Sequence, residues 1–329
     1  MKCERVAENI RPPSKDCYLR MKVTGNVVEL LWQNHKSVAP GIRKINSELY
    51  EDLRTGEVKE FHHIENCSED LVSVSRSLSR LRDLLNTNVT DVKKCRWVTL
   101  TYADNMTDPE RLYCNFKEFN RRHRKRVGHY EYIAAAEPQG RGAWHLHVVM
   151  IFDHKAPYIK NADMSADWRQ GFVTVKKLDD VDNVGAYLTA YLGDMELNQE
   201  TIDDIGVMNL VGKEVREVEV TDNRGKKSKK SFIKGARLHM YPPQFNLYRY
   251  SKGIKKPEII QTTEEKAQKK VSSGKLTFEK TLVLSDTDKD FERVLNYRYY
   301  NLLRKKGQEE VSAEDASDAS VMLTDVIHR

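Results

Sequence analysis

His145 and His147 are the residues of this chain whose type and spacing point most directly to chemistry. They lie two residues apart inside an otherwise apolar run, residues 144–150. Because side chains on a β-strand alternate between its two faces, both imidazoles project on one side, and Trp144 and Leu146 project on the other. Two adjacent imidazoles suit one metal ion, but an isolated pair of this kind is more often a pair of hydrogen-bonded core histidines.

Glu137 supplies a third candidate ligand. It ends the run of residues 130–137 and precedes His145 by eight residues. Turn-forming residues at 138–143 predict an antiparallel hairpin, and a loop that sets Glu137 opposite His145 brings the two side chains within about 5 Å. Glu137, His145 and His147 would then form a metal site with open positions, which by itself also fits zinc hydrolases and non-haem iron enzymes. The alternative is an ordinary hairpin with a solvent-facing Glu137.

Tyr187 and Tyr191 lie four residues apart on a predicted helix over residues 182–192. The expected buried stripe of this helix comprises Val181, Val184, Leu188, Leu192 and Met195. Four-residue spacing places the two tyrosines on one neighbouring face, where such pairs are usually core or interface aromatics. Beside a metal, however, a tyrosine can act as a nucleophile that forms a covalent intermediate.

The elements that must position these residues form a recognisable order. Residues 96–102 read as a strand that enters a loop, and a helix, the histidine hairpin and the tyrosine helix follow. This order resembles that of the HUH endonucleases, specifically the rolling-circle replication initiators of plasmids, phages and integrative elements. The three family motifs are matched by residues 98–102, by His145-Leu146-His147, and by Tyr187 with Tyr191 in the two-tyrosine version. The resemblance covers roughly residues 70–260.

The resemblance implies an α+β fold of the HUH/Rep type, in which an antiparallel sheet carries the metal ligands and helices pack on one face. In such an enzyme Glu137, His145 and His147 hold Mg²⁺ or Mn²⁺. Tyr187 or Tyr191 attacks the scissile phosphate of single-stranded or hairpin origin DNA, and leaves a 5′-phosphotyrosine and a 3′-hydroxyl that primes synthesis. A host helicase and the host replication machinery are the implied partners, since the sequence contains no Walker A motif.

One departure from the family concerns a lysine. Many members carry a lysine three residues after a catalytic tyrosine, where this chain has Ala190 and Asp194. Lys176 or Lys177 is the candidate replacement. The departure keeps open a DNA-binding protein without catalysis, and the ligand set keeps open a metalloenzyme that acts on a small molecule.

Charge and composition favour a polyanionic partner. The formal net charge is +6, and the acidic residues 309–329 alone carry −5, which leaves +11 for the rest. The five cysteines are scattered without a Cys-x-x-Cys pair, so free thiols are expected. No apolar stretch approaches the ~20 residues that a membrane span needs, and the amino terminus lacks a signal-peptide core, so we expect a soluble cytoplasmic protein without a membrane partner.

Two basic segments are candidate DNA contacts. A helix capped by Asp108 and opened by Pro109 ends in a run that holds five basic residues: Arg121, Arg122, Arg124, Lys125 and Arg126. One or two such charges would complement the helix dipole, and five favour phosphate contacts. Aromatic residues of the segment 241–250, interleaved with Arg249 and Lys252, could stack on single-stranded bases or simply pack on the core.

These features divide the chain into four expected segments. Residues 1–67 form an amino-terminal accessory region that contains a β-hairpin around Thr24-Gly25-Asn26, and residues 68–260 form the endonuclease domain. Residues 261–308 form a carboxy-terminal extension, with a polar linker at 262–274, a strand at 276–284 and a helix at 290–305. Residues 309–329 form a disordered acidic tail.

Overall fold

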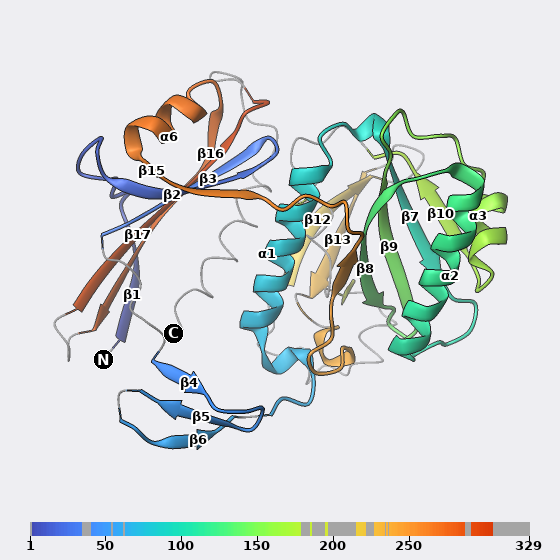
Figure 1. Ribbon diagram of the computed structural model, residues 1–329, viewed down its shortest axis with the longest axis horizontal. Coiled ribbons are helices and arrows are strands. Elements are labelled where there is room, and N and C mark those ends of the chain that lie inside the picture. Colours follow the sequence, from blue (N-terminus) through green and yellow to red (C-terminus); the bar gives the residue numbers. More distant parts are fainter. Residues whose placement is uncertain are drawn as a thin grey trace.

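The computed structural model describes residues 2–34, 41–53, 55–61, 63–178, 185, 195–196, 215–221, 227–233, 235, 237–286 and 291–304. It is an α+β molecule whose sheets are built from antiparallel strand pairs (Figure 1). Among these residues, no helix combines the length and apolarity that crossing a bilayer requires.

A five-stranded sheet carries the histidine hairpin at its centre. Its strand order is β10-β7-β9-β8-β14. The strands are β7 (Cys95–Thr101), β8 (Glu131–Pro138), β9 (Trp144–Ile151), β10 (Val173–Lys176) and β14 (Tyr248–Tyr250). Strand β9 is buried on both faces, since Val148 and Val149 are both almost inaccessible to solvent. Such a strand is fixed in register, because a slip of one residue would exchange its two faces.

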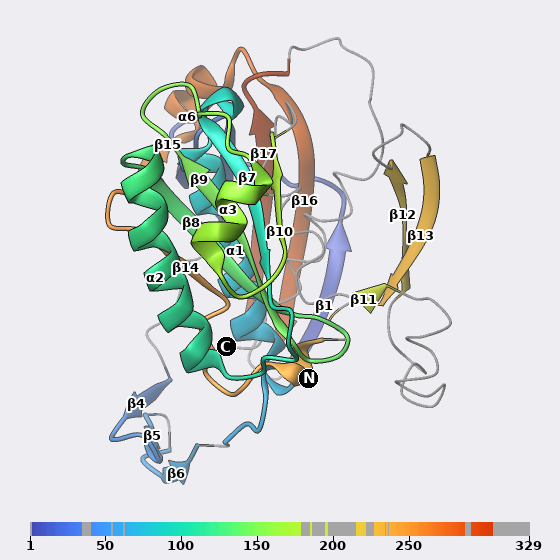
Figure 2. The ribbon, with the colours of Figure 1, turned by 90° about the vertical axis from the view of Figure 1, so that its right-hand side faces the viewer.

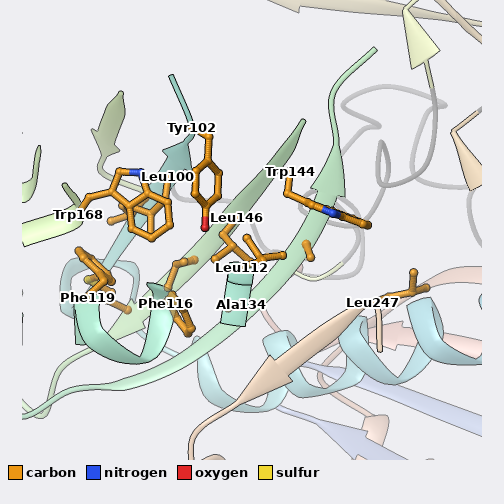
Figure 3. Packing of buried hydrophobic residues seen from close by; sticks show 14 of the residues in the cluster. Leu100, Tyr102, Leu112, Phe116, Phe119, Ala134, Trp144, Leu146, Trp168 and Leu247 are labelled. Carbon is orange, nitrogen blue, oxygen red and sulfur yellow. The ribbon is translucent and has the colours of Figure 1, made fainter. Parts of the chain in front are cut away.

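Helices cover both faces of this sheet, so the expectation of helices on one face is wrong. Helix α2 (Pro109–Val127) and helix α3 (Asn161–Trp168) lie on the face to which Trp144, Leu146 and Val148 point. Figure 3 shows Phe116 and Phe119 of α2 packed towards Leu100, Leu146 and Trp168. Helix α1 (Leu71–Asn88) covers part of the other face through Leu81, Leu84 and Leu85. Periodicity predicts that a helix has an apolar stripe, but not which face of a sheet receives it.

The helix boundaries follow capping chemistry. As expected, Asp108 caps α2 by accepting hydrogen bonds from the backbone N–H groups of Glu110 and Arg111, and Pro109 occupies the first turn. Asp70 caps α1 in the same way and follows a short 3₁₀ turn, η1 (Cys67–Glu69). Two more 3₁₀ turns are η2 (Val92–Lys94) and η4 (Leu238–Met240).

A six-stranded sheet joins the two ends of the described chain. Its order is β1-β16-β17-β3-β2-β15. The strands are β1 (Lys2–Ala7), β2 (Tyr18–Thr24), β3 (Val27–Gln33), β15 (Glu258–Thr263), β16 (Lys275–Asp286) and β17 (Phe291–Asn301), with helix α6 (Glu264–Val271). The predicted hairpin around Gly25 is confirmed as β2 and β3. Residues 1–67 and 261–308 thus share a sheet.

Two expectations for the carboxy-terminal extension are wrong. Residues 262–274 form the end of β15 and helix α6 instead of a linker. Residues 291–301 form strand β17 instead of a helix, because they lie between β16 and β3, and most side chains of residues 294–301 are buried on both faces. A strand of that kind lacks the polar alternation that distinguishes a strand from a helix in sequence.

Two smaller three-stranded sheets complete the structure. One contains β4 (Ile42–Lys44), β5 (Leu49–Asp52) and β6 (Val58–Glu60). The other contains β11 (Met195–Glu196), β12 (Val215–Thr221) and β13 (Lys227–Ile233), and it stands away from the five-stranded sheet in Figure 2. One expectation is wrong here: Met195 lies in a strand instead of on the tyrosine helix.

Candidate metal centre

The hairpin of β8 and β9 brings the three predicted ligands together. Glu137 pairs directly with His145, and Ala135 pairs with His147. Directly paired residues share a face of an antiparallel sheet, so all three side chains lie on one side. The observed register is therefore the one that a shared site for Glu137, His145 and His147 requires.

The turn between the two strands fixes this register. Gln139 and Ala143 close the turn with a backbone hydrogen bond of 2.8 Å, and Gly142 adopts a positive φ of 88° that favours glycine. On the far face, the indole of Trp144 donates to the carbonyl of Thr107 at 2.9 Å and stacks on Phe245. These contacts of Trp144 fix the hairpin on one face, and the three candidate ligands lie on the other face.

The three side chains form a compact cluster. Glu137 Oε2 lies 3.1 Å from His145 Nε2 and 2.9 Å from His147 Nε2. All three candidate ligand atoms lie within 4.8 Å of one another. Glu137 is buried, while the two histidines are partly open to solvent. The two imidazoles are therefore in contact with solvent at the ligand face of the sheet.

The residues fit a divalent cation. Adjacent ligands of an octahedral ion with bonds of about 2.1 Å lie about 3 Å apart. The separations of 3.1 and 2.9 Å between Glu137 Oε2 and the two Nε2 atoms match that spacing. Two imidazoles and one carboxylate leave coordination positions for water or substrate, and this donor set does not distinguish Mg²⁺ or Mn²⁺ from other divalent ions.

The surroundings of the cluster shift the pKa values of Glu137 and His145. Burial alone would raise the pKa of Glu137, but hydrogen bonds from both histidines and the charge of Arg237 lower it well below its ordinary value. Burial lowers the pKa of His145 despite the neighbouring Glu137. The carboxylate is therefore ionised, and His145 is neutral at pH 7, with a lone pair available to a metal.

Arg237 is a functional candidate that the sequence did not reveal. Its guanidinium donates to Glu137 Oε1 at 2.6 Å, so that Oε1 faces Arg237 while Oε2 faces the histidines. Leu238 and Tyr241 anchor the neighbouring η4 turn, since both are buried and the Tyr241 hydroxyl donates to the carbonyl of Ala136. No local pattern marks Arg237, which lies 100 residues from its partner along the chain.

Strand β7 supplies two side chains that contact the His147 ring. Thr99 pairs with His147 across the strands, and its hydroxyl lies 3.3 Å from His147 Nδ1. The Trp97 ring lies 5.2 Å from the His147 ring. Such contacts restrict the orientation of a ligating imidazole. Thr99 belongs to residues 98–102, which match the first family motif, and Trp97 directly precedes them.

Tyr187 and Tyr191 lie outside the described residues. Gly185, two positions before Tyr187, is described and is packed on α1. Its N–H donates to Asn86 Oδ1 at 2.7 Å, and an added Cβ would lie 2.4 Å from the carbonyl oxygen of Arg82. Since α1 covers the face that carries Glu137, His145 and His147, Gly185 lies on the ligand-face side of the sheet.

The basic run at the end of α2 lies far from the cluster. Helix α2 packs on the opposite face, and its last turn lies beside Tyr130 at the start of β8, whereas Glu137 is near the end of that strand. Most of its charges have protein partners. Arg121 pairs with Glu118, Arg122 and Arg126 bind Asp167 of α3, and Arg124 donates to the carbonyl of Tyr130, while Lys125 is exposed. A role of the run in DNA binding stays a prediction.

The aromatic segment after η4 is divided between core and surface. Tyr241 and Phe245 pack on Trp144, as the core alternative expects. Arg249 lies on β14 opposite Ala134 with its guanidinium 3.4 Å from the ring centre of Tyr113. Lys252 is exposed beyond the end of β14. DNA binding by Arg249 and Lys252 also stays a prediction.

The sequence of the site segment matches a known family. Residues 95–196, which include β7, the histidine hairpin and both tyrosines, match the model of a family of replication-associated proteins of the ORF2 type. The resemblance to replication initiators is therefore confirmed for this segment, and the match indicates a role in DNA replication. No curated protein and no solved structure matches the chain.

Proposed function

We propose that this protein initiates rolling-circle replication as an HUH-type endonuclease that cuts and rejoins one DNA strand. The observation that carries the proposal is the direct pairing of Glu137 with His145, which joins both histidines to one carboxylate inside the segment that matches replication-associated proteins. A metal held there supplies positive charge that polarises a scissile phosphate. Mg²⁺ or Mn²⁺ is the proposed ion.

Tyr187 or Tyr191 is the proposed nucleophile. The phenolic oxygen forms a bond to phosphorus, the bond from phosphorus to the 3′ oxygen breaks, and that oxygen takes up a proton to become a free 3′-hydroxyl. Because the phosphodiester energy is kept in the tyrosine linkage, the reverse attack by a 3′-hydroxyl rejoins DNA without an external energy source. Four-residue spacing allows the two tyrosines to serve one site in turn. Tyr187 is the proposed initiating residue, and Tyr191 the terminating one.

The proposed partners follow from this chemistry. The substrate is single-stranded or hairpin origin DNA, and a host helicase and polymerase extend the free 3′ end. Residues 68–260 are the proposed nuclease domain. The outer segments 1–67 and 261–308, whose strands pair in one sheet, are its proposed accessory regions.

Incubating the protein with origin-bearing single-stranded DNA and Mn²⁺ tests the proposal. We expect a protein–DNA adduct that survives denaturation and that does not form in EDTA. DNA binding without an adduct would favour a non-catalytic DNA-binding protein. Metal binding with no affinity for DNA would favour a metalloenzyme acting on a small molecule.

A further inference from the structure

Strand β10 presents its outward side chains on the ligand face of the five-stranded sheet. It is the edge strand next to β7, with Val173 opposite Leu100 and Val175 opposite Val98. Val173 and Val175 pack against the core under α2 and α3. Alternation along the strand therefore places Thr174 and Lys176 on the other face, and Phe172, which directly precedes β10 and bonds to Thr101 of β7, continues this alternation; all three are exposed. We call these three residues the β10 platform.

The β10 platform is continuous with the metal centre. The carbonyl of Phe172 accepts a hydrogen bond from the N–H of Thr101 at 2.9 Å, and Thr101 pairs with His145, which pairs with Glu137. One row across the sheet thus runs from Phe172 to Glu137. Strands in a sheet are about 4.8 Å apart, so Phe172 lies about 10 Å from His145 across β7. A nucleotide next to a phosphate at the metal centre can span that distance.

Phe172 is exposed to an unusual degree for a phenylalanine, at 73 %. Single exposed apolar residues are normal on protein surfaces, so exposure alone carries no function. The position of Phe172 is what matters, because it is an uncovered ring in the same row as two candidate ligands. An aromatic face of this kind stacks on any nucleic-acid base.

Positive charge flanks the ring on both sides. Lys176 lies at the other end of β10, followed by the exposed Lys177. Arg141 reaches the opposite end, where its guanidinium donates to the carbonyl of Tyr102 at 3.1 Å. Gly171 touches the backbone of Thr101 and Ala103 beside it, which brings Phe172 close to the same loop. A ring between cations is the arrangement that grips bases and phosphates of a single strand.

We propose that the β10 platform holds single-stranded DNA beside the metal centre, with Phe172 stacked on a base and Lys176 on the backbone. This inference rests on the proposed function, and it assigns to that function a binding surface that is separate from the basic run of α2. Stacking on Phe172 tolerates every base, so the surface contributes affinity and positioning and little sequence preference.

Binding of the full chain to a short fluorescent single-stranded oligonucleotide in EDTA tests the proposal without cleavage. Phe172→Ala and Phe172→Leu should each bind about 5- to 100-fold more weakly, since base stacking is lost in both. Phe172→Trp should keep the affinity, and its added emission should be quenched by DNA beyond the quenching seen in the wild type. Tyr158→Ala is the matched control, because Tyr158 is 84 % exposed but lies near the start of β7, at the other end of the sheet from His145.

The outcomes separate this inference from the proposed function. Wild-type affinity in Phe172→Ala, or equal losses in Phe172→Ala and Tyr158→Ala, would overturn the platform while adduct formation by the wild type still supported the nuclease. Affinity in Phe172→Leu equal to that in Phe172→Trp would also overturn it, because an aliphatic side chain cannot stack. A wild type that binds no single-stranded DNA would refute both.

Discussion

At the scale of single residues, the proposed function depends on one carboxylate whose two oxygens have different partners. Glu137 Oε2 lies against His145 and His147, while Oε1 lies against Arg237. The histidines and Glu137 could be named as candidates from sequence, because strand alternation and a hairpin turn are local patterns, but the register that pairs Glu137 with His145 came from the structure. Arg237 was not, because the contact joins distant parts of the chain through tertiary packing.

Removing a ligand should remove the metal. We expect His145→Ala and His147→Ala each to abolish Mn²⁺ binding at this site and Mn²⁺-dependent nicking, while the protein stays folded, because both side chains are partly exposed and fill little core volume. Isothermal titration with Mn²⁺ and circular dichroism measure the two properties. Wild-type nicking in either variant would contradict the ligand assignment.

Arg237 should act as a positioning residue. Loss of a partner that orients a ligating carboxylate costs about 10- to 100-fold in metal affinity. We therefore expect Arg237→Gln to bind Mn²⁺ more weakly by that factor and Arg237→Lys to recover part of the loss, because a lysine keeps the charge near Oε1. Direct Mn²⁺ titration provides the measurement. Unchanged affinity in Arg237→Gln would leave the arginine a purely structural role.

At the scale of elements, α1 and α2 have different tasks on the two faces of the sheet. Helix α1 covers part of the ligand face and touches Gly185, whereas the end of α2 holds α3 through Asp167. The sequence predicted α2 and its Asp108 cap. It did not predict α3, nor that α1 would share a face with the ligands, because helix periodicity carries no information about the partner surface.

Gly185 should couple α1 to the tyrosine segment. Alanine at this position would place a Cβ 2.4 Å from the Arg82 carbonyl oxygen, so the segment must shift. We expect Gly185→Ala to slow nicking while Mn²⁺ affinity stays at the wild-type value. Gly140→Ala is the control, since an added Cβ there meets nothing within 4 Å. Equal nicking rates for the two variants would argue against the coupling.

The contact between α2 and α3 should make stability depend on pH. Burial lowers the pKa of His123 below 6.5 despite its hydrogen bond to Asp167. Burial alone would raise the pKa of Asp167, but hydrogen bonds from Arg126 and His123 lower it below 3.8. The unfolded chain therefore binds more protons than the folded one in acid, so the free energy of unfolding falls as pH drops below about 6.5 and again below about 3.8.

Urea unfolding at several pH values checks this dependence. Asp167→Asn should lower the free energy of unfolding at pH 7 by about 2 kcal/mol, the order expected for lost hydrogen bonds to charged groups. Its stability should also fall less steeply than that of the wild type between pH 4 and pH 3. If the wild type is as stable at pH 5 as at pH 7, His123 does not contribute in the way described.

At the scale of the whole molecule, the two outer segments of the chain pair with each other in the six-stranded sheet, which contacts α1 through β2. Strand β2 reaches α1 through an ion pair of 3.0 Å between Lys22 and Asp83, and the turn at Gly25 abuts the Asn86 carbonyl oxygen of the same helix. Figure 1 shows α1 between the two larger sheets. Sequence reasoning placed the amino-terminal hairpin correctly but mistook β17 for a helix, because a strand buried on both faces has no polar alternation.

Two truncations should distinguish the contribution of residues 309–329 to stability from that of the six-stranded sheet. Ending the chain at residue 308 should leave the free energy of unfolding and nicking unchanged, because all six strands remain. Ending it at residue 260 removes β16, β17 and α6, and exposes the buried side chains of β3. We expect that variant to aggregate or to be degraded by protease at once. Wild-type protease resistance in the shorter variant would mean that β1–β3 do not depend on the extension.

Peptide mapping of the trapped protein–DNA adduct is the most direct test of the central claim. Origin-bearing single-stranded DNA and Mn²⁺ should give an adduct in which the 5′ phosphate is attached to Tyr187 in the wild type. Tyr187→Phe should lose most initial nicking, Tyr191→Phe should nick without releasing closed circles, and the double variant should form no adduct. Attachment at Tyr191 alone would only exchange the two roles. Attachment at neither tyrosine, or no adduct under conditions in which the metal and DNA are both bound, would contradict the account.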